Sequence, residues 1–127
     1  MSQSGFKILL VEDEFFLAEN IKLRLEFNHF EVFLAETGQE ALDLIKSQKM
    51  DLVLMDILMP VMDGLTAIKK LREEYTKDQL PILALSAKAR EVDRNEALTA
   101  GANDYLSKPF EMDDLLQLIH KYIKKDS

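Results

Sequence analysis

Acidic residues stand at the ends of two apolar segments. The triplet Glu12–Glu14 follows Phe6–Val11, and Asp56 follows Leu52–Met55. An ionised carboxylate is costly to bury without a partner, so an aspartate at the end of an apolar strand needs a compensating cation. Hard divalent cations such as Mg²⁺ prefer oxygen ligands of this kind. The pattern therefore predicts a carboxylate site for a cation, with Met59–Met62 as an apolar loop over it.

Two further polar residues follow later apolar segments. Ser86 closes Ile82–Leu85, and Lys108 comes shortly after Asp104–Leu106. An ammonium group at the same sheet edge would balance the acids and can bind an anion that a metal brings in. Alternatively, Lys108 is an ordinary lysine on the solvated surface. Ser86 taken alone does not indicate a function.

The acids exclude one large class of α/β proteins. Nucleotide and flavin binders place a glycine-rich loop after their first strand, so that a phosphate rests on backbone N–H groups. The loop here reads VEDEFF and has no glycine. We expect the protein ligands of Mg²⁺ to be the carboxylates of Glu12, Asp13 and Asp56 and the backbone carbonyl of Leu58. Alternatively, Glu12–Glu14 only cap the following helix, which acids favour.

Five short apolar segments alternate with longer segments of helical period. The expected strands are Phe6–Val11, Phe30–Leu34, Leu52–Met55, Ile82–Leu85 and Asp104–Leu106. The expected helices are Glu14–Phe27, one headed by Thr37, Gly64–Tyr75, Arg90–Ala100 and Glu111–Lys125. Strict alternation implies right-handed crossovers and a parallel sheet covered on both faces. Ligands of such sheets bind outside the carboxyl ends of the strands, where the polar residues stand.

Local signals mark the ends of several elements. Thr37 with Glu40 three residues later forms a capping box, and Gly101 ends the fourth helix. Asp51 and Asp63, which flank Asp56, are expected to start a strand and to cap a helix. One face of the first helix is expected to contain Phe16, Ile21 and Leu25.

Composition and charge narrow the class of protein. The 127 residues are 47% hydrophobic and 31% charged, as in one globular domain, and the formal net charge of −7 argues against binding to nucleic acid or anionic membranes. The chain has no cysteine, which excludes disulfides, thiolate zinc sites and cysteine nucleophiles. It has no signal core or membrane-spanning run. We expect one cytoplasmic domain over residues 1–127, ordered from about 5 to 125, with no output domain.

The ordered set Glu12-Asp13, Asp56, Ser86 and Lys108-Pro109 resembles the receiver domain of two-component response regulators. The likeness covers the whole chain, from KILLVEDE through DLVLMDILMPVMDG and ILALSA to GANDYLSKPF. It implies a flavodoxin-like (βα)5 fold, doubly wound, whose parallel strands follow the order 2-1-3-4-5. It also implies that Asp56 accepts a phosphoryl group in a reaction that uses Mg²⁺ or Mn²⁺.

The resemblance assigns roles to four more residues. Ser86 takes the place of the hydroxyl that binds the phosphoryl oxygen, and Lys108 that of the lysine that salt-bridges it. Tyr105 falls on the aromatic switch position, which turns inward in the active state, with Ser86 as the other switch residue. Pro109 is expected to follow a cis peptide bond.

The resemblance also implies partners. The phosphoryl donor would be a sensor histidine kinase or a histidine phosphotransfer protein, and a downstream protein would bind the face built from Arg90–Ala100, Asp104–Leu106 and Glu111–Lys125. Such a protein catalyses its own phosphorylation and dephosphorylation.

Two alternatives remain open. One is a docking module that is not phosphorylated; such modules usually lose an acid or the lysine. The other is a hydrolase of the aspartyl-phosphatase type, which needs a second aspartate where Leu58 stands.

Overall fold

The computed structural model describes residues 5–59 and 62–123. Its strands are β1 (Lys7–Val11), β2 (Glu31–Ala35), β3 (Leu52–Asp56), β4 (Ile82–Ser86) and β5 (Asp104–Ser107). Its helices are α1 (Phe15–Phe27), α2 (Gly38–Ser47), α3 (Gly64–Arg72), α4 (Glu91–Ala100) and α5 (Met112–Tyr122). None of the helices in these two ranges is long and apolar enough to cross a membrane. Pro60 and Val61 of the loop predicted over the site lie outside the described residues, as do Lys124 and Lys125.

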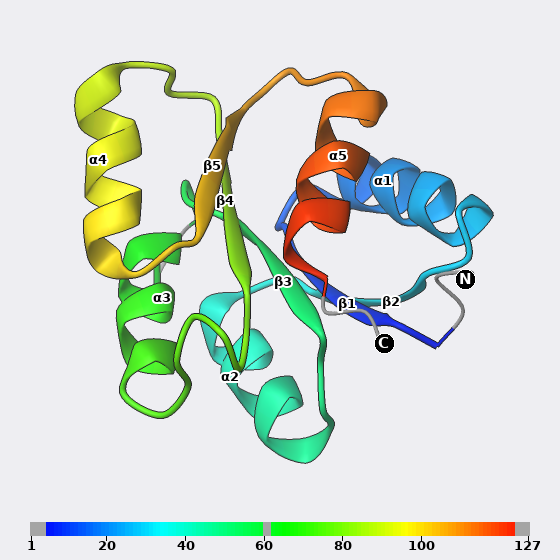
Figure 1. Cartoon of the computed structure of the whole chain (residues 1–127), viewed down its shortest axis with the longest axis horizontal. Helices are drawn as coiled ribbons and strands as arrows, with labels where there is room; N and C mark the ends of the chain where they lie inside the picture. The colour runs from blue at the N-terminus through cyan, green and yellow to red at the C-terminus, as the bar shows by residue number, and fades with distance from the viewer. Residues whose placement is uncertain (1–4, 60–61, 124–127) are drawn as a thin grey trace.

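The strands form one parallel sheet in the order β2-β1-β3-β4-β5. In Figure 1, α1 and α5 cover one face of the sheet, and α2, α3 and α4 cover the other. The predicted flavodoxin-like fold is therefore confirmed. In this strand order the winding reverses between β1 and β3, and open parallel sheets bind their ligands outside the carboxyl ends of the strands at such a point.

Successive residues of the central strands point to opposite faces of the sheet. Leu9 and Val53 join one apolar cluster with α2, α3 and α4, whereas Ile8 and Leu54 join a second cluster with α1 and α5. Every residue of β3 and β4 is buried, as expected for strands covered on both faces. The two clusters therefore fix the central strands and the residues at their carboxyl ends.

The predicted helix signals are present. Thr37 Oγ1 accepts the N–H of Glu40 at 3.0 Å, and Glu40 Oε1 accepts the N–H of Glu36 at 2.6 Å. The capping box thus closes on the residue before the cap rather than on Thr37 itself. Gly101 ends α4 with φ at 127°, a conformation that favours glycine.

Asp51 and Asp63 have the structural roles expected of them. Asp51 Oδ2 accepts the N–H of Lys7 at 2.7 Å, which ties the start of β1 to the start of β3. Asp63 is the N-cap of α3, and its Oδ1 accepts the N–H of Thr66 at 2.9 Å. Asp51 and Asp63 thus have structural roles, and Asp56 is the aspartate of the three that stands at the carboxyl edge of the sheet.

The prediction for one face of α1 is partly wrong. The residues that α1 buries are Ala18, Ile21 and Leu25. Phe16 is 80% exposed. At about 100° per residue, Phe16 lies about 140° around the helix from Ile21 and cannot share its face. Leu23 and Phe27 point outward with Phe16, at 65% and 85% exposure, so α1 is apolar on two sides.

The predicted ends of α3 and α5 lie too far along the chain. α3 ends at Arg72 rather than Tyr75, because the chain beyond it turns back toward the Arg72 guanidinium. α5 ends at Tyr122, since Ile123 is already extended, with φ at −73° and ψ at 127°. Strand ends shift by a single residue, with β1 beginning at Lys7 and β2 at Glu31.

Arg72 joins three segments at the far end of the sheet. Its guanidinium donates to the carbonyl oxygens of Tyr75, Thr76, Leu80 and Gly101 and to Oδ1 of Asn103, at 2.8–3.3 Å. Asn103 Oδ1 also accepts the N–H of Ile82 at 2.9 Å. The end of α3, the start of β4 and the turn before β5 are therefore held by one side chain.

Replacing Arg72 by methionine is expected to lower the free energy of unfolding by about 2–4 kcal/mol. Met keeps an apolar stem but leaves partly buried carbonyl groups without their donor. Urea unfolding measures the change, with exposed Arg24→Met as the control. A loss below about 1 kcal/mol would show that water satisfies these carbonyl groups equally well.

Candidate functional site

Asp56 is the last residue of β3, which lies between β1 and β4 in the sheet. The N–H of the next residue, Ile57, donates to the carbonyl of Leu85 at 2.9 Å, which extends the pairing past the end of the strand. Oδ1 of Asp56 accepts the N–H of Leu58 at 3.2 Å. The central strand and this turn leave the carboxylate little freedom at the carboxyl edge.

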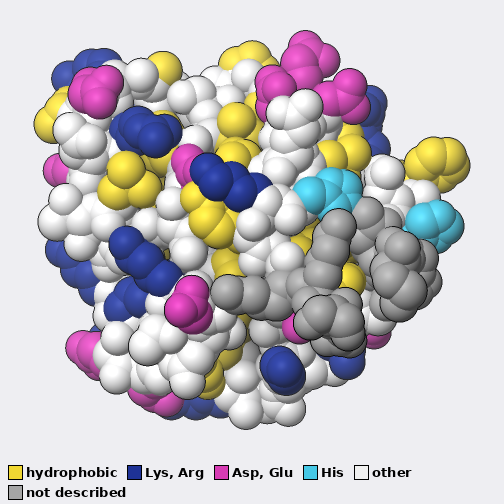
Figure 2. Space-filling view, in the orientation of Figure 1, with side chains coloured by type: hydrophobic (Ala, Val, Ile, Leu, Met, Phe, Trp, Pro, Cys, Tyr) yellow, Lys and Arg dark blue, Asp and Glu magenta, His cyan; other side chains and the backbone are white. Residues whose placement is uncertain are grey.

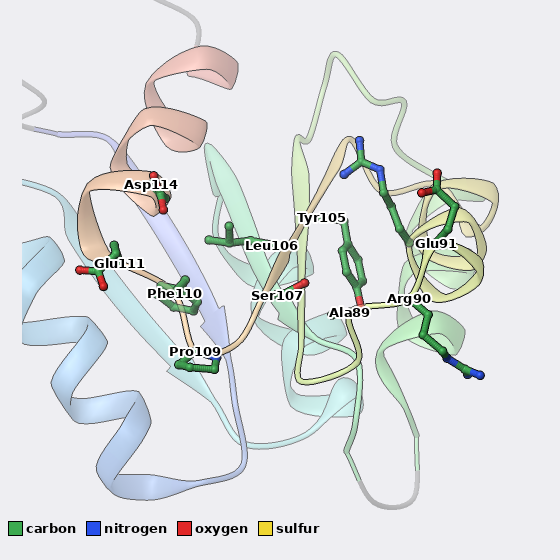
Figure 3. Close-up of a pocket in the computed structure, with 11 residues that line it drawn as sticks. Ala89, Arg90, Glu91, Tyr105, Leu106, Ser107, Pro109, Phe110, Glu111 and Asp114 are labelled. Atoms are coloured by element: carbon green, nitrogen blue, oxygen red, sulfur yellow. The ribbon is translucent and has the colours of Figure 1, made fainter.

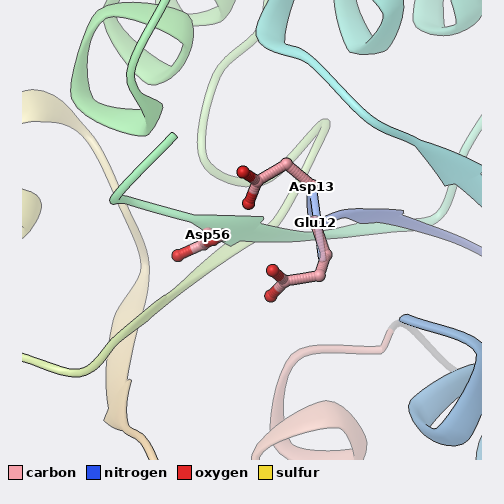
Figure 4. Close-up of side chains that lie close together, drawn as sticks. All are labelled: Glu12, Asp13 and Asp56. Carbon is pink, nitrogen blue, oxygen red and sulfur yellow. The ribbon is translucent and has the colours of Figure 1, made fainter. Parts of the chain in front are cut away.

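Three carboxylates from two strands gather at this edge (Figure 4). Oxygen atoms of Glu12, Asp13 and Asp56 lie within 4.8 Å of one another. Glu12 and Asp56 are each only 3% exposed, whereas Asp13 is open to solvent. The structure therefore brings together the three acids that the sequence singled out, two of them out of contact with bulk water.

Lys108 reaches these acids from the loop between β5 and α5. Its Nζ lies 2.7 Å from Glu12 Oε1 and 3.5 Å from Asp56 Oδ1. Only 17% of the side chain is exposed, so the alternative of a solvated surface lysine is wrong. The Lys108–Pro109 peptide bond is cis, as predicted.

Helix capping does not account for the acidic triplet. Glu14 is the N-cap residue of α1 and makes no side-chain capping bond. Glu12 Oε2 instead accepts the N–H of Glu14 at 3.1 Å, while its Oε1 binds Lys108. One oxygen of Glu12 thus binds the lysine of the site, while the other holds the backbone N–H of the N-cap residue of α1.

The site has more negative charge than its lysine can balance. Burial, and next the nearby charge of Glu12, raises the pKa of Asp56 to about 6, against the opposing effects of Lys108 and the Leu58 N–H. One ammonium group faces three carboxylates, of which two are buried. A divalent cation would offset this surplus, and carboxylate oxygens are the ligands that Mg²⁺ prefers.

Ser86 and Tyr105 hold the loop after β4 from two sides. Ser86 is 1% exposed, and its Oγ accepts the N–H of Lys88 at 3.1 Å. The Tyr105 ring is buried, and its hydroxyl donates to the carbonyl of Lys88. Figure 3 shows this ring extending from β5 toward the loop at Ala89. The alternative of a half-buried tyrosine on an edge strand is therefore wrong, and the ring points inward.

A charged cluster on the face of α4, β5 and α5 was not predicted. The carboxylate of Asp104 accepts the Tyr122 hydroxyl at 2.9 Å and lies 3.7 Å from Arg94 and 3.8 Å from Lys121. These partners are distant in sequence, so no local pattern signals them. Asp104 joins both flanking helices to β5.

The chain matches the family model of the response regulator receiver domain over residues 8–120. A parallel sheet in this order, with acids at the ends of β1 and β3 and a lysine after β5, agrees with that match. The chain belongs to this family, the receiver domains of two-component response regulators.

Individual relatives fit the same assignment. The response regulator MprA of Mycolicibacterium vanbaalenii is 42% identical over 119 residues, which cover 94% of this chain and 51% of that protein. The chain thus spans about half the length of the curated relatives it matches. The receiver domain of the Francisella response regulator 1452 is 33% identical, with a TM-score of 0.86, and the match covers 93% of this chain and 96% of that chain.

A third relative comes from a complex. A chain of the co-crystal structure of the Saccharomyces cerevisiae histidine phosphotransfer signalling protein Ypd1 and the receiver domain of Ssk1 is 28% identical. Its TM-score is 0.86, and the match covers 96% of this chain and 91% of that chain. The structures similar to this chain thus include one solved in a complex with a histidine phosphotransfer protein.

Proposed function

We propose that this chain is a phosphoacceptor switch that takes a phosphoryl group onto Asp56 from a phosphohistidine donor. The observation that carries the proposal is the meeting of the buried Asp56 carboxylate with Glu12 and Lys108 at one edge of the sheet. A docking module without phosphorylation has no use for this costly buried charge. The cytoplasmic location expected from the sequence belongs to the same proposal.

In the proposed reaction, an oxygen of the Asp56 carboxylate attacks the phosphorus of a phosphoimidazole. The O–P bond forms as the N–P bond breaks, and the imidazole leaves with the bonding electron pair and takes up a proton from water. Negative charge then spreads over the three equatorial oxygens of the phosphoryl group. The Lys108 ammonium, 3.5 Å from Asp56 Oδ1, lies where it can stabilise that charge. The product is an acyl phosphate, which water can hydrolyse.

The cluster of acids fits a magnesium site. Glu12, Asp13, Asp56 and the carbonyl of Leu58 would hold Mg²⁺ or Mn²⁺. When bound, the cation supplies positive charge to the phosphoryl oxygens and lowers the pKa of Asp56. Leu58 stands where an aspartyl phosphatase needs its second aspartate, so the hydrolase alternative has no general acid at that position.

The proposal is tested by incubation with acetyl phosphate and Mg²⁺, read by intact mass. We expect one added phosphoryl group on the native protein and none on Asp56→Asn. Asp63→Asn is the matched control, since it alters an acid of the same loop while asparagine keeps the N-cap. Chelation of Mg²⁺ should prevent labelling. An unlabelled native protein, or equal labelling of Asp56→Asn, would favour the docking module instead.

The switch would act through the loop that follows β4. Ser86 Oγ accepts the N–H of Lys88, and the Ser86 O–H can donate to a phosphoryl oxygen on Asp56. A shift of Ser86 toward that group would pull the loop through the Lys88 N–H. Tyr105 holds the same loop through the Lys88 carbonyl. Its buried ring thus gives the site a mechanical link to β5, the central strand of the proposed output face.

The downstream protein would bind the face formed by α4, β5 and α5. A groove of about 450 Å³ opens there (Figure 3). It is lined by the N-cap Arg90 and by Arg94 of α4, by Tyr105 of β5, and by Phe110 and Glu111 before α5. Figure 2 shows acidic side chains gathered at the top of the view, over the start of α5, whose first turn is acidic. A partner with basic residues beside an apolar anchor would fit this face.

The phosphohistidine donor would dock on α1. The first turn of α1 lies beside the acids of β1, and Phe16, Leu23 and Phe27 form an outward apolar stripe. A hollow of about 470 Å³ beside α1 is lined by Leu17 and Arg24 from this helix and by Lys108. An exposed apolar stripe that leads to the reacting group is the kind of surface that a partner protein covers.

The double variant Phe16→Ala, Leu23→Ala is expected to slow transfer from a phosphohistidine protein at least about 10-fold, because a few large side chains that become buried on binding carry most of the binding energy of such interfaces. Labelling by acetyl phosphate, which needs no docking, should stay within about twofold. Parallel time courses with the two donors measure both rates, with exposed Val92→Ala on α4 as control. Equal loss with both donors would place the effect in the site rather than in docking.

A further inference from the structure

Gly64, the first residue of α3, packs directly on the backbone that carries Asp56. It is buried, and its N–H donates to the carbonyl of Ile57 at 3.0 Å. The chain therefore leaves β3 and returns so that the start of α3 rests on the peptide between Asp56 and Ile57. The next residue along the chain is Leu58, the expected carbonyl ligand.

The contact is possible only because residue 64 has no side chain. A Cβ at Gly64 would lie 2.4 Å from the carbonyl oxygen of Asp56 and 2.7 Å from Cα of Ile57. Both atoms belong to the backbone, so neither can rotate away as a flexible side chain can. Gly64 is not among the glycines with positive φ, Gly5 and Gly101, so lack of space rather than backbone conformation requires glycine.

Gly38 offers a matched comparison within the same chain. It is the first residue of α2, it is buried, and the preceding N-cap accepts a backbone N–H, as at Gly64. A Cβ at Gly38 would lie 2.8 Å from Sδ and 3.0 Å from Cγ of Met62, and 3.3 Å from Cβ of Ala67, which need give by only a few tenths of an ångström. A methionine side chain is flexible and can move aside. The two glycines share helix position and burial but differ in what a methyl group would displace.

We propose that Gly64 is a positioning residue, which sets the place of the Asp56 carboxylate and the Leu58 carbonyl by holding α3 against the end of β3. This inference rests on the proposed function. Alanine at 64 must open the contact by about 1 Å to reach ordinary van der Waals distance, and a misplacement of that size can cost about 10²-fold in rate. Mg²⁺ demands near-ideal ligand geometry, so the same displacement should weaken its binding.

The test compares Gly64→Ala with Gly38→Ala. The measurements are the Mg²⁺ dissociation constant by calorimetry, the initial rate of acetyl phosphate labelling at saturating Mg²⁺, the backbone amide shifts of residues 56–59 and the urea midpoint. For Gly64→Ala we expect a folded protein, at least about 10-fold weaker Mg²⁺ binding, and labelling about 10²-fold slower even at saturating Mg²⁺. For Gly38→Ala, both the Mg²⁺ dissociation constant and the labelling rate should stay within about threefold of the native values, because the Met62 side chain can move aside and Ala67 need shift only slightly.

The inference is overturned if the Mg²⁺ dissociation constant and the labelling rate of Gly64→Ala both lie within threefold of the native values. It is also overturned if Gly64→Ala and Gly38→Ala lose Mg²⁺ affinity and labelling rate to the same extent. An unfolded Gly64→Ala protein would also overturn it, since Gly64 would then serve the fold rather than the site. If the native protein itself is not labelled, the proposed function fails. Mg²⁺ binding and the amide shifts then still decide whether Gly64 positions the edge of the sheet.

Discussion

Replacing Lys108 by alanine is expected to slow phosphorylation of Asp56 by about 10²–10³-fold and yet to tighten Mg²⁺ binding. The slower reaction follows because a fixed cation beside the developing phosphoryl charge is removed. The tighter metal binding follows because Nζ no longer competes at 2.7 Å for Glu12 Oε1. With the ammonium gone, the affinity for Mg²⁺ should rise about tenfold or more, equivalent to about 1.4 kcal/mol.

Calorimetry with Mg²⁺ and labelling time courses at saturating Mg²⁺ separate the two effects. Lys69→Ala, an exposed lysine on α3, is the control for loss of one positive charge. Lys108→Arg should recover only part of the rate, because a planar guanidinium does not replace a compact ammonium group. Weaker Mg²⁺ binding by Lys108→Ala would mean that the lysine organises the acids instead of competing with the cation.

Metal-free native protein is expected to lose stability as the pH rises from about 4 to about 6. The folded state holds the proton of Asp56 up to a pKa of about 6, whereas the unfolded chain releases it near 3.8. Between these values the folded state binds more protons, so the free energy of unfolding falls with rising pH. Two units of pKa correspond to a loss of about 3 kcal/mol. The loss is complete above pH 6.

Asp56→Asn should remove this loss, and it should therefore be more stable than the native protein at pH 7 by about the same 3 kcal/mol without metal. Saturating Mg²⁺ should restore the native protein, because the cation stabilises the ionised carboxylate and favours the folded state. Urea midpoints from pH 4 to pH 8, with and without Mg²⁺, measure the change in stability with pH. Asp63→Asn is the control for loss of one carboxylate from the same loop. A native protein that gains stability across that pH window would contradict the predicted sign.

The sequence predicts which polar residues lie together because strand ends in a parallel sheet share an edge. Once Val11, Met55 and Leu85 are placed on neighbouring strands, the residues that follow them must meet, whatever the details of packing. The charge pattern then supplies the chemistry. The partner of Lys108 is less predictable, since its closest contact is Glu12 rather than Asp56, and this choice depends on side-chain reach.

Contacts between distant segments could not be predicted. Arg72 reads as an ordinary surface residue at a helix end, and its acceptors come from loops whose path no local pattern determines. Gly64 reads as half of an Asp-Gly turn, although the space it leaves for Asp56 is what requires glycine. For Phe16, the spacing of apolar residues predicts a place on the buried face. Its angle around the helix shows that it cannot lie on that face.

The outward stripe of α1 has a practical consequence for solution behaviour. Large apolar side chains in water favour association between copies, and mutual charge repulsion opposes it. At pH 7 the formal net charge of −7 opposes association between copies, but near the isoelectric point of about 4.8 that repulsion vanishes. Mild acid should therefore promote self-association through Phe16 and Phe27. The measurement of stability against pH must for this reason be made with dilute protein.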